Sequence, residues 1–86
     1  MKKIILTISD PHGLHARKAA SLVKEFKGLK SDISVQHDGI VIDGKSILGL
    51  MSLSVGFEEK LTINIAGHDE QDDFHHITNF LQSNKF

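Results

Sequence analysis

The chain has 86 residues, no cysteine, and nearly balanced charge, with 10 Lys and Arg against 11 Asp and Glu. This length supports one modest hydrophobic core and so one domain, residues 1–86, which no disulfide can stabilise. The balanced charge argues against a protein that coats nucleic acid, and no apolar run approaches the ~20 residues of a membrane span. We expect a cytoplasmic protein that does not bind nucleic acid or insert into a membrane.

The first elements expected are a strand over 2–8, where apolar residues alternate, and a helix over 16–27. Between them, Pro11 and Gly13 indicate a turn. Gly28 is a suitable helix end. The buried positions of this helix recur at helical spacing, at Ala19, Leu22, Phe26 and Leu29.

The middle of the chain predicts a hairpin followed by a short helix. Residues 32–37 and 40–43 alternate polar and apolar side chains around Asp38-Gly39, a dipeptide typical of two-residue hairpin turns. Ser46 is a good N-cap for a helix that starts at Ile47. That helix has more apolar residues than one face can bury, so part of it should face solvent or a partner.

The last elements expected are a strand over 60–66 and a helix that begins after Asp69, its expected N-cap. The strand should point Leu61, Ile63 and Ile65 inward. The helix should bury one stripe, formed by Phe74, Ile77, Phe80 and Leu81. The fold predicted is an α+β two-layer open-faced sandwich, in which helices cover one face of a four-stranded antiparallel sheet, in the order β-α-β-β-α-β-α.

His15 stands at the expected start of the helix over 16–27, a position that suits a phosphoryl acceptor. First-turn N–H groups lack partners inside their helix and favour an anion. A neutral imidazole is a nucleophile near neutral pH, and a phosphoryl group on it would meet those N–H groups and Arg17. By itself, however, a histidine at a helix start is more often a polar cap or a solvated side chain. The local pattern leaves both roles open.

The remaining histidines do not predict a metal site. His12 and His15 are three residues apart, but neither a cysteine nor a third ligand lies near them. His37 and His68 are expected at the surface. We expect no metal, no cofactor and no catalytic machinery of an enzyme.

Two motifs resemble the HPr family, the histidine-containing phosphocarriers of the bacterial phosphoenolpyruvate-dependent sugar phosphotransferase system. The first is Gly13-Leu14-His15-Ala16-Arg17, and the second is KSILGLMSL over 45–53, which places Ser46 31 residues after His15. The resemblance covers essentially the whole chain. It favours the acceptor role for His15 over the cap.

The resemblance implies a carrier that takes a phosphoryl group on His15, as a tele-type phosphohistidine, with Arg17 assisting. The donor would be enzyme I, charged by phosphoenolpyruvate, and the recipients would be the IIA components of sugar permeases. Ser46 would be the regulatory site of an HPr kinase/phosphorylase, whose product binds a catabolite-control regulator. The partner-binding surface implied for the monomer comprises Ala16, Lys18, Ala20, Lys24, Lys27, Ile47, Leu48 and Met51.

Two positions depart from the family pattern. Lys18 stands where the family usually has proline, and it is expected to add a cation near the phosphoryl site. In the segment Ser54-Val55-Gly56-Phe57, the glycine of the turn that follows the short helix is shifted, and Phe57 is expected to be exposed.

Two other readings remain. One is an HPr-like regulatory paralogue that acts through Ser46 and a transcription regulator, or a nitrogen-related branch of the phosphotransferase system. In that class glutamine can replace the active histidine, so His15 argues against it. The other is a ferredoxin-like ligand-binding or RNA-binding module, which the neutral charge and the missing strand aromatics disfavour.

Overall fold

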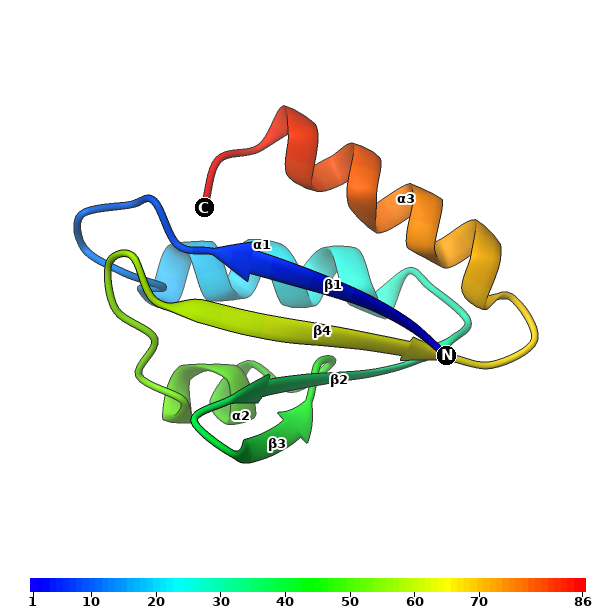
Figure 1. Cartoon of the computed structure of the whole chain (residues 1–86), viewed down its shortest axis with the longest axis horizontal. Coiled ribbons are helices and arrows are strands. Elements are labelled where there is room, and N and C mark those ends of the chain that lie inside the picture. Colours follow the sequence, from blue (N-terminus) through cyan, green and yellow to red (C-terminus); the bar gives the residue numbers. More distant parts are fainter.

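The computed structural model describes the whole chain, residues 1–86. Its helices and strands follow the predicted order (Figure 1). They are β1 (Lys2–Thr7), α1 (Ala16–Lys27), β2 (Asp32–His37), β3 (Ile40–Asp43), α2 (Ile47–Ser52), β4 (Lys60–Ala66) and α3 (Glu70–Ser83).

The four strands form one antiparallel sheet in the order β1-β4-β2-β3. β4 is therefore central, with Ile63 opposite Ile4 of β1 and opposite Val35 of β2. This pairing explains the clean alternation over 60–66: Leu61, Ile63 and Ile65 are buried, and the residues between them are not.

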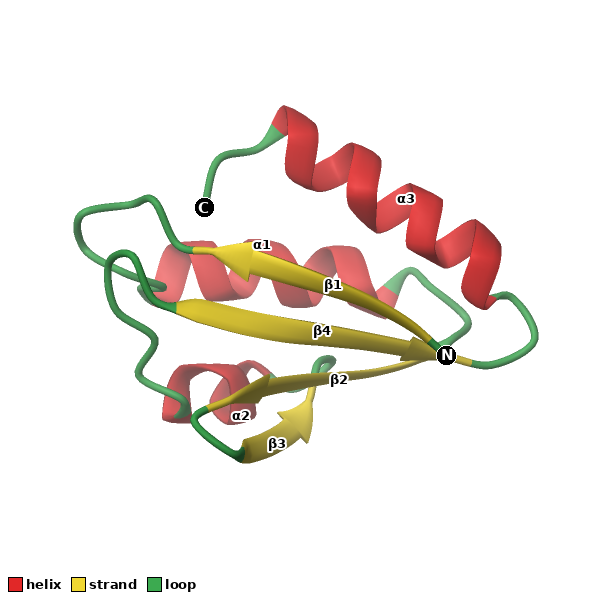
Figure 2. Ribbon diagram, in the orientation of Figure 1, coloured by secondary structure: helices red, strands yellow, loops and turns green.

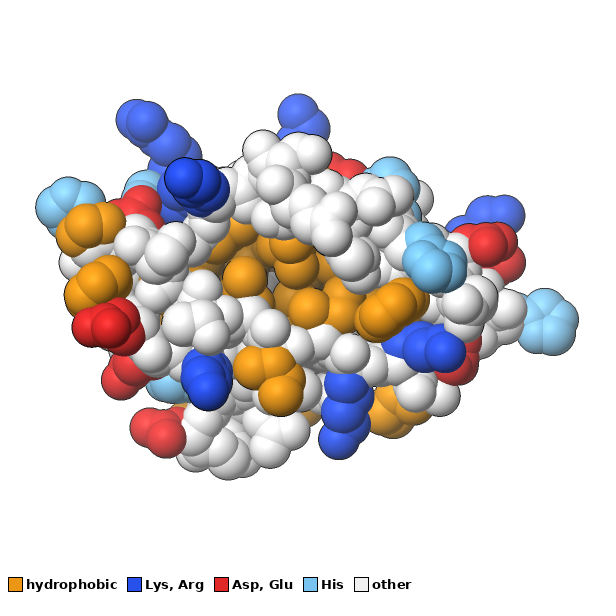
Figure 3. All heavy atoms as spheres, turned by 45° about the horizontal axis from the view of Figure 1, so that its top comes forward, with side chains coloured by type: hydrophobic (Ala, Val, Ile, Leu, Met, Phe, Trp, Pro, Cys, Tyr) orange, Lys and Arg blue, Asp and Glu red, His pale blue; other side chains and the backbone are white.

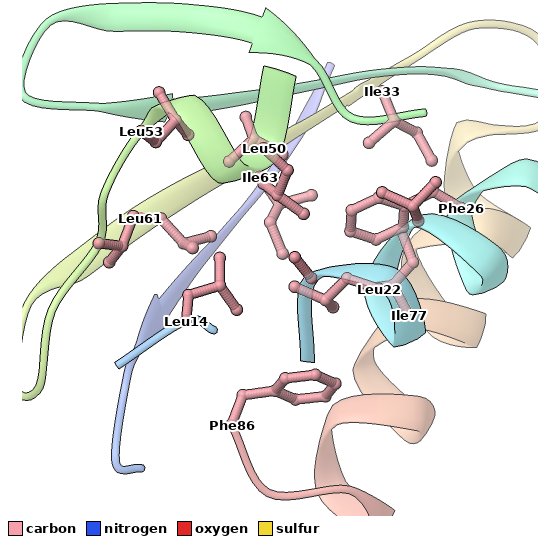
Figure 4. Packing of buried hydrophobic residues seen from close by; sticks show 14 of the residues in the cluster. Leu14, Leu22, Phe26, Ile33, Leu50, Leu53, Leu61, Ile63, Ile77 and Phe86 are labelled. Carbon is pink, nitrogen blue, oxygen red and sulfur yellow. The ribbon is translucent and has the colours of Figure 1, made fainter. Parts of the chain in front are cut away.

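The helices cover one face of this sheet, as predicted. In Figures 1 and 2, α1 and α2 lie behind the strands and α3 runs along the β1 side. Figure 4 shows side chains of α1, α2 and the sheet converging on one core, with Leu22, Phe26, Leu50 and Ile63 near its centre. The opposite face of the sheet is left open, and Ile5 of β1 is exposed there.

Helix α3 differs in part from its prediction. Of the four residues expected to be buried, only Ile77 is fully so, whereas Phe74, Phe80 and Leu81 pack against the core with partial exposure. The reason is that α3 contacts β1, an edge strand, and β4, so its stripe lies at the margin of the sheet. Figure 3 shows hydrophobic side chains open to view in a hollow of this face, with charged groups around the periphery.

The turn after α2 contains Gly56, the glycine that is shifted relative to the family pattern. Ser54, the second residue after this helix, has a φ of 51°, in the left-handed region that favours glycine. Phe57 is exposed, as predicted. No helix in the chain combines the length and the apolar character needed to span a bilayer.

Candidate functional site

The loop before α1 places His15 at the N-cap of that helix, as expected. Gly13 has a φ of +72°, and a Cβ atom there would lie 2.7 Å from the carbonyl oxygen of Val55. The next residue, Leu14, is buried and donates its N–H to the same oxygen at 2.9 Å. Glycine is needed at this position because the loop runs directly against the segment that follows α2.

The start of α1 has the features of an anion site. The N–H groups of Ala16, Arg17 and Lys18 have no hydrogen-bond partner in the chain, and the His15 side chain does not cap them. Arg17 is exposed and forms no ion pair. These donors and the positive end of the helix dipole are therefore free for an oxyanion held beside the imidazole.

His15 makes a contact that the sequence did not predict. Its Nε2 lies 3.2 Å from Oδ2 of Asp10, and about a third of the His15 side chain remains exposed. The other carboxylate oxygen, Oδ1, accepts the N–H of His12 at 2.8 Å. The hydrogen bond from His12 and the contact with His15 hold the pKa of the Asp10 carboxyl below its ordinary value.

The Asp10 contact counts against the expected tele-type site. A phosphoryl group on Nε2 would displace the carboxylate and bring two anions together. Nδ1, by contrast, forms no hydrogen bond within the chain. Asp10 also has a recognisable sequence signal, because Asp before a turn often accepts the N–H two residues on.

Lys18 does not act as an extra cation for His15, contrary to the expectation. Its Nζ donates to the carbonyl of Lys85 at 2.6 Å and lies 5.2 Å from the centroid of the Phe86 ring. The long side chain instead fixes the segment after α3 against α1, a contact between residues 67 apart in sequence.

Ser46 caps α2 as predicted, because its Oγ accepts the N–H of Gly49 at 3.0 Å. The helix has two unlike faces. Leu50 is buried, as is Leu53 directly after the helix, whereas Leu48 is 79% exposed and Ile47 and Met51 are also exposed.

The residues expected to bind partners occupy two adjacent helices, since α1 and α2 are in contact. We call this set the α1–α2 surface; it consists of Ala16, Ala20, Lys24, Lys27, Ile47, Leu48 and Met51. All seven are exposed. Lys18 is only half-exposed and is already bonded, so it contributes least to such a surface.

His37, His68 and the largest surface depression lie apart from the loop that carries His15. The prediction for His37 was wrong: its side chain is only 10% exposed, and its Nδ1 donates to the carbonyl of Lys60 at 2.9 Å. His68 is exposed, as predicted. The largest depression, about 530 Å³, is lined by residues such as Ile33, Ile42 and Asn64 and includes none of the predicted site residues.

Comparison with known proteins gives one consistent result. A family model described as "PTS HPr component phosphorylation site" matches residues 2–83. HPr-C-His from Thermoanaerobacter tengcongensis is similar over 96% of this chain and 93% of its own, with 32% identity and a TM-score of 0.85. The phosphocarrier protein HPr from Bacillus anthracis has 32% identity over 92% and 94% of the two chains and a TM-score of 0.80.

A regulatory relative is also similar. The catabolite repression protein Crh of Bacillus subtilis, described as a dimer with a swapped domain, has 32% identity over 100% of this chain and 99% of its own. Its TM-score is 0.71.

Proposed function

Because the chain belongs to the HPr family of the phosphotransferase system, a family of phosphocarriers, we propose that His15 accepts a phosphoryl group from phosphorylated enzyme I. The phosphoryl group, which enzyme I draws from phosphoenolpyruvate, then passes to the IIA components of sugar permeases. The observation that carries this proposal is the position of His15 at the N-cap of α1, where about a third of its side chain is exposed and three N–H groups lack partners. No substrate cavity is needed at such a site, because the partner supplies the rest of the active centre.

The geometry supports Nδ1 as the acceptor atom. Its lone pair attacks the phosphorus, so that a new N–P bond forms while the bond from phosphorus to the donor breaks. The phosphoryl oxygens can then accept from the free N–H groups of α1 and pair with the guanidinium of Arg17. In the second transfer, a nucleophile of the IIA component attacks the phosphorus, so that a new bond to the recipient forms while the N–P bond breaks and Nδ1 regains its lone pair.

The α1–α2 surface supports docking of those partners. Exposed Ile47, Leu48 and Met51 give it an apolar centre, and Lys24 and Lys27 in the last turn of α1 supply cations. Such a small surface suits transient binding to acidic partners, because charge raises the association rate and a small apolar contact allows release. We propose that the transferring species is a monomer in the cytoplasm, where these partners act.

The test is transfer from enzyme I and phosphoenolpyruvate, followed by intact mass and acid lability. We expect one acid-labile phosphoryl group on the wild type, none on His15→Ala, and full modification of His12→Ala. His12 is the matched control because it is an exposed histidine in the same loop, with its ring centroid 6.4 Å from that of His15. A wild-type chain that gains no phosphoryl group would contradict the carrier function.

A second function is regulation through Ser46, favoured by its place at the start of α2 next to exposed Ile47 and Leu48. A phosphoryl group adds about −1.5 to −2 charge, which the N-terminus of α2 can tolerate but an acidic partner would repel. An ATP-dependent HPr kinase/phosphorylase should give an acid-stable modification that Ser46→Ala loses and Ser54→Ala keeps. Transfer to Ser46→Asp should be slower than to the wild type, and an unchanged rate would exclude the repulsion.

A further inference from the structure

The contact between Asp10 and His15 resembles the carboxylate-imidazole pair of hydrolytic enzymes in its arrangement. Oδ2 of Asp10 lies 3.2 Å from Nε2 of His15, and about a fifth of the Asp10 side chain is exposed. Oδ1 is held independently by the N–H of His12. The carboxylate therefore cannot rotate freely, and it presents one oxygen to the imidazole.

The backbone of Asp10 is also fixed from the far end of the chain. Its N–H donates to the carbonyl oxygen of Phe86 at 3.1 Å, and the Phe86 side chain is buried. Figure 4 shows the Phe86 ring pointing into the core from the segment after α3. Lys18 holds the same segment through the Lys85 carbonyl. The loop that carries the carboxylate is thus held by the His12 N–H at the side chain of Asp10 and by Phe86 at its backbone.

An ionised carboxylate can only accept hydrogen bonds, so the hydrogen of this contact must be on Nε2. A neutral imidazole has one N–H, and placing it on Nε2 leaves the lone pair on Nδ1. The hydrogen bond to Asp10 therefore decides which ring nitrogen can act as the nucleophile.

We propose that Asp10 is a positioning residue for phosphoryl transfer: it holds His15 as the Nε2–H tautomer and stabilises the cationic ring that forms when Nδ1 is phosphorylated. This inference rests on the carrier function proposed above. In the step itself Nδ1 gains the phosphorus, the donor keeps the electron pair of the broken bond, and Nε2 keeps its hydrogen. The ring becomes positively charged, and the Asp10 carboxylate lies against that charge.

Few other groups could perform this role. His12 is a titratable side chain in the same loop, but its ring centroid lies 6.4 Å from that of His15 and no hydrogen bond joins the two rings. Arg17 is exposed, and the ammonium of Lys18 is bonded to the Lys85 carbonyl. Both are cations and cannot accept the Nε2 hydrogen.

The experiment compares the full chain with Asp10→Asn, using ¹⁵N NMR of the unphosphorylated imidazole and the rate of transfer from enzyme I. The Asn side chain can still accept the His12 N–H, which preserves the loop, but its amide would donate to Nε2 and favour the Nδ1–H tautomer. We expect the wild type to be mainly Nε2–H and Asp10→Asn mainly Nδ1–H. The transfer rate should fall about 10- to 100-fold.

The matched control is Asp43→Asn. The carboxylate of Asp43 accepts the N–H of Lys45 at 2.9 Å, which is the same contact to the residue two positions on, but it touches no histidine. This variant should keep both the wild-type tautomer and the wild-type rate. An Nδ1–H tautomer in the wild type, or an unchanged tautomer and rate in Asp10→Asn, would overturn the role of Asp10.

The two proposals fail separately. If the wild type accepts no phosphoryl group, the carrier function is wrong and Asp10 has no role in transfer. If the wild type is phosphorylated on His15 but Asp10→Asn reacts at the same rate, the carrier function stands and the positioning role is wrong.

Discussion

Ser46 combines two properties at a single residue. Its hydroxyl oxygen caps α2 by accepting from Gly49, and the same hydroxyl is the proposed site of regulatory phosphorylation. A cap satisfies an N–H that would otherwise lack a partner, so its value is structural and does not depend on any kinase.

The cap predicts a measurable loss of stability in Ser46→Ala. We expect the free energy of unfolding to fall by about 1 kcal/mol, because the N–H of Gly49 loses its acceptor. Urea unfolding of the unmodified protein measures this difference. Ser52→Ala is the control: its exposed hydroxyl donates to the Gly49 carbonyl within the same helix, and its removal should change stability by less than about 0.5 kcal/mol. Equal losses in the two variants would show that capping is not the cause.

Helix α2 divides its few residues between the core and the solvent. Leu50 is buried in the core, whereas Leu48 is 79% exposed. An isolated helix of six residues is marginal in water, so packing of the buried side holds α2 in place and leaves the other side free. The exposed side chains of Ile47, Leu48 and Met51 form an apolar patch of the kind that the proposed docking role requires.

The exposed side of α2 predicts a binding defect without a folding defect. Leu48→Ser should raise the KM for this chain in the enzyme I reaction about five- to thirtyfold, as expected for the loss of about 1–2 kcal/mol at an interface. Thermal unfolding should be unchanged. Ile5→Ser is the matched control, because Ile5 is 67% exposed on the open face of the sheet. A KM that responds equally to both changes would exclude a specific docking role for α2.

Across the whole molecule, α3 is tied to the rest of the fold through a buried polar contact. Oδ2 of Asp73 accepts both the N–H of Ser31, at 2.9 Å, and the hydroxyl of Ser31, at 2.6 Å. Burial favours the neutral carboxyl, but these hydrogen bonds outweigh it, and the pKa of Asp73 is lowered. His76 and Glu25 make a second contact between α3 and α1.

The lowered pKa of Asp73 predicts acid sensitivity. The unfolded chain binds a proton at Asp73 near pH 3.9, before the folded chain does, so this contribution to stability is present above that pH and is lost below it. Asp73→Asn should lower the free energy of unfolding at pH 7 by about 1–3 kcal/mol and flatten its decline towards pH 2. Urea unfolding across this pH range is the measurement. Asp72→Asn, at an exposed position of the same helix, should preserve the wild-type decline, and a matching effect there would refute the assignment to Asp73.

The sequence by itself determined the order of the helices and strands and the place of His15 at a helix start. Helical and strand periods, the Asp38-Gly39 turn and the Ser46 cap are local signals, because each depends on residues within one or two turns of the chain, and all four agree with the structure. The position of His15 at the start of α1 followed from the same kind of signal.

Only the tertiary structure decided how His15 is held. Its contact with Asp10 depends on the path of the loop, which is set by hydrogen bonds to Val55 and to Phe86, and neither partner is near in sequence. The true partner of Lys18 lies 67 residues away, and the partner of Asp73 lies 42 residues away. The burial of Asp73 follows from its contact with Ser31, and the partial exposure of the stripe on α3 follows from packing beside β1, an edge strand. These contacts join segments that are far apart in the sequence, so a local pattern of polar and apolar residues cannot predict them.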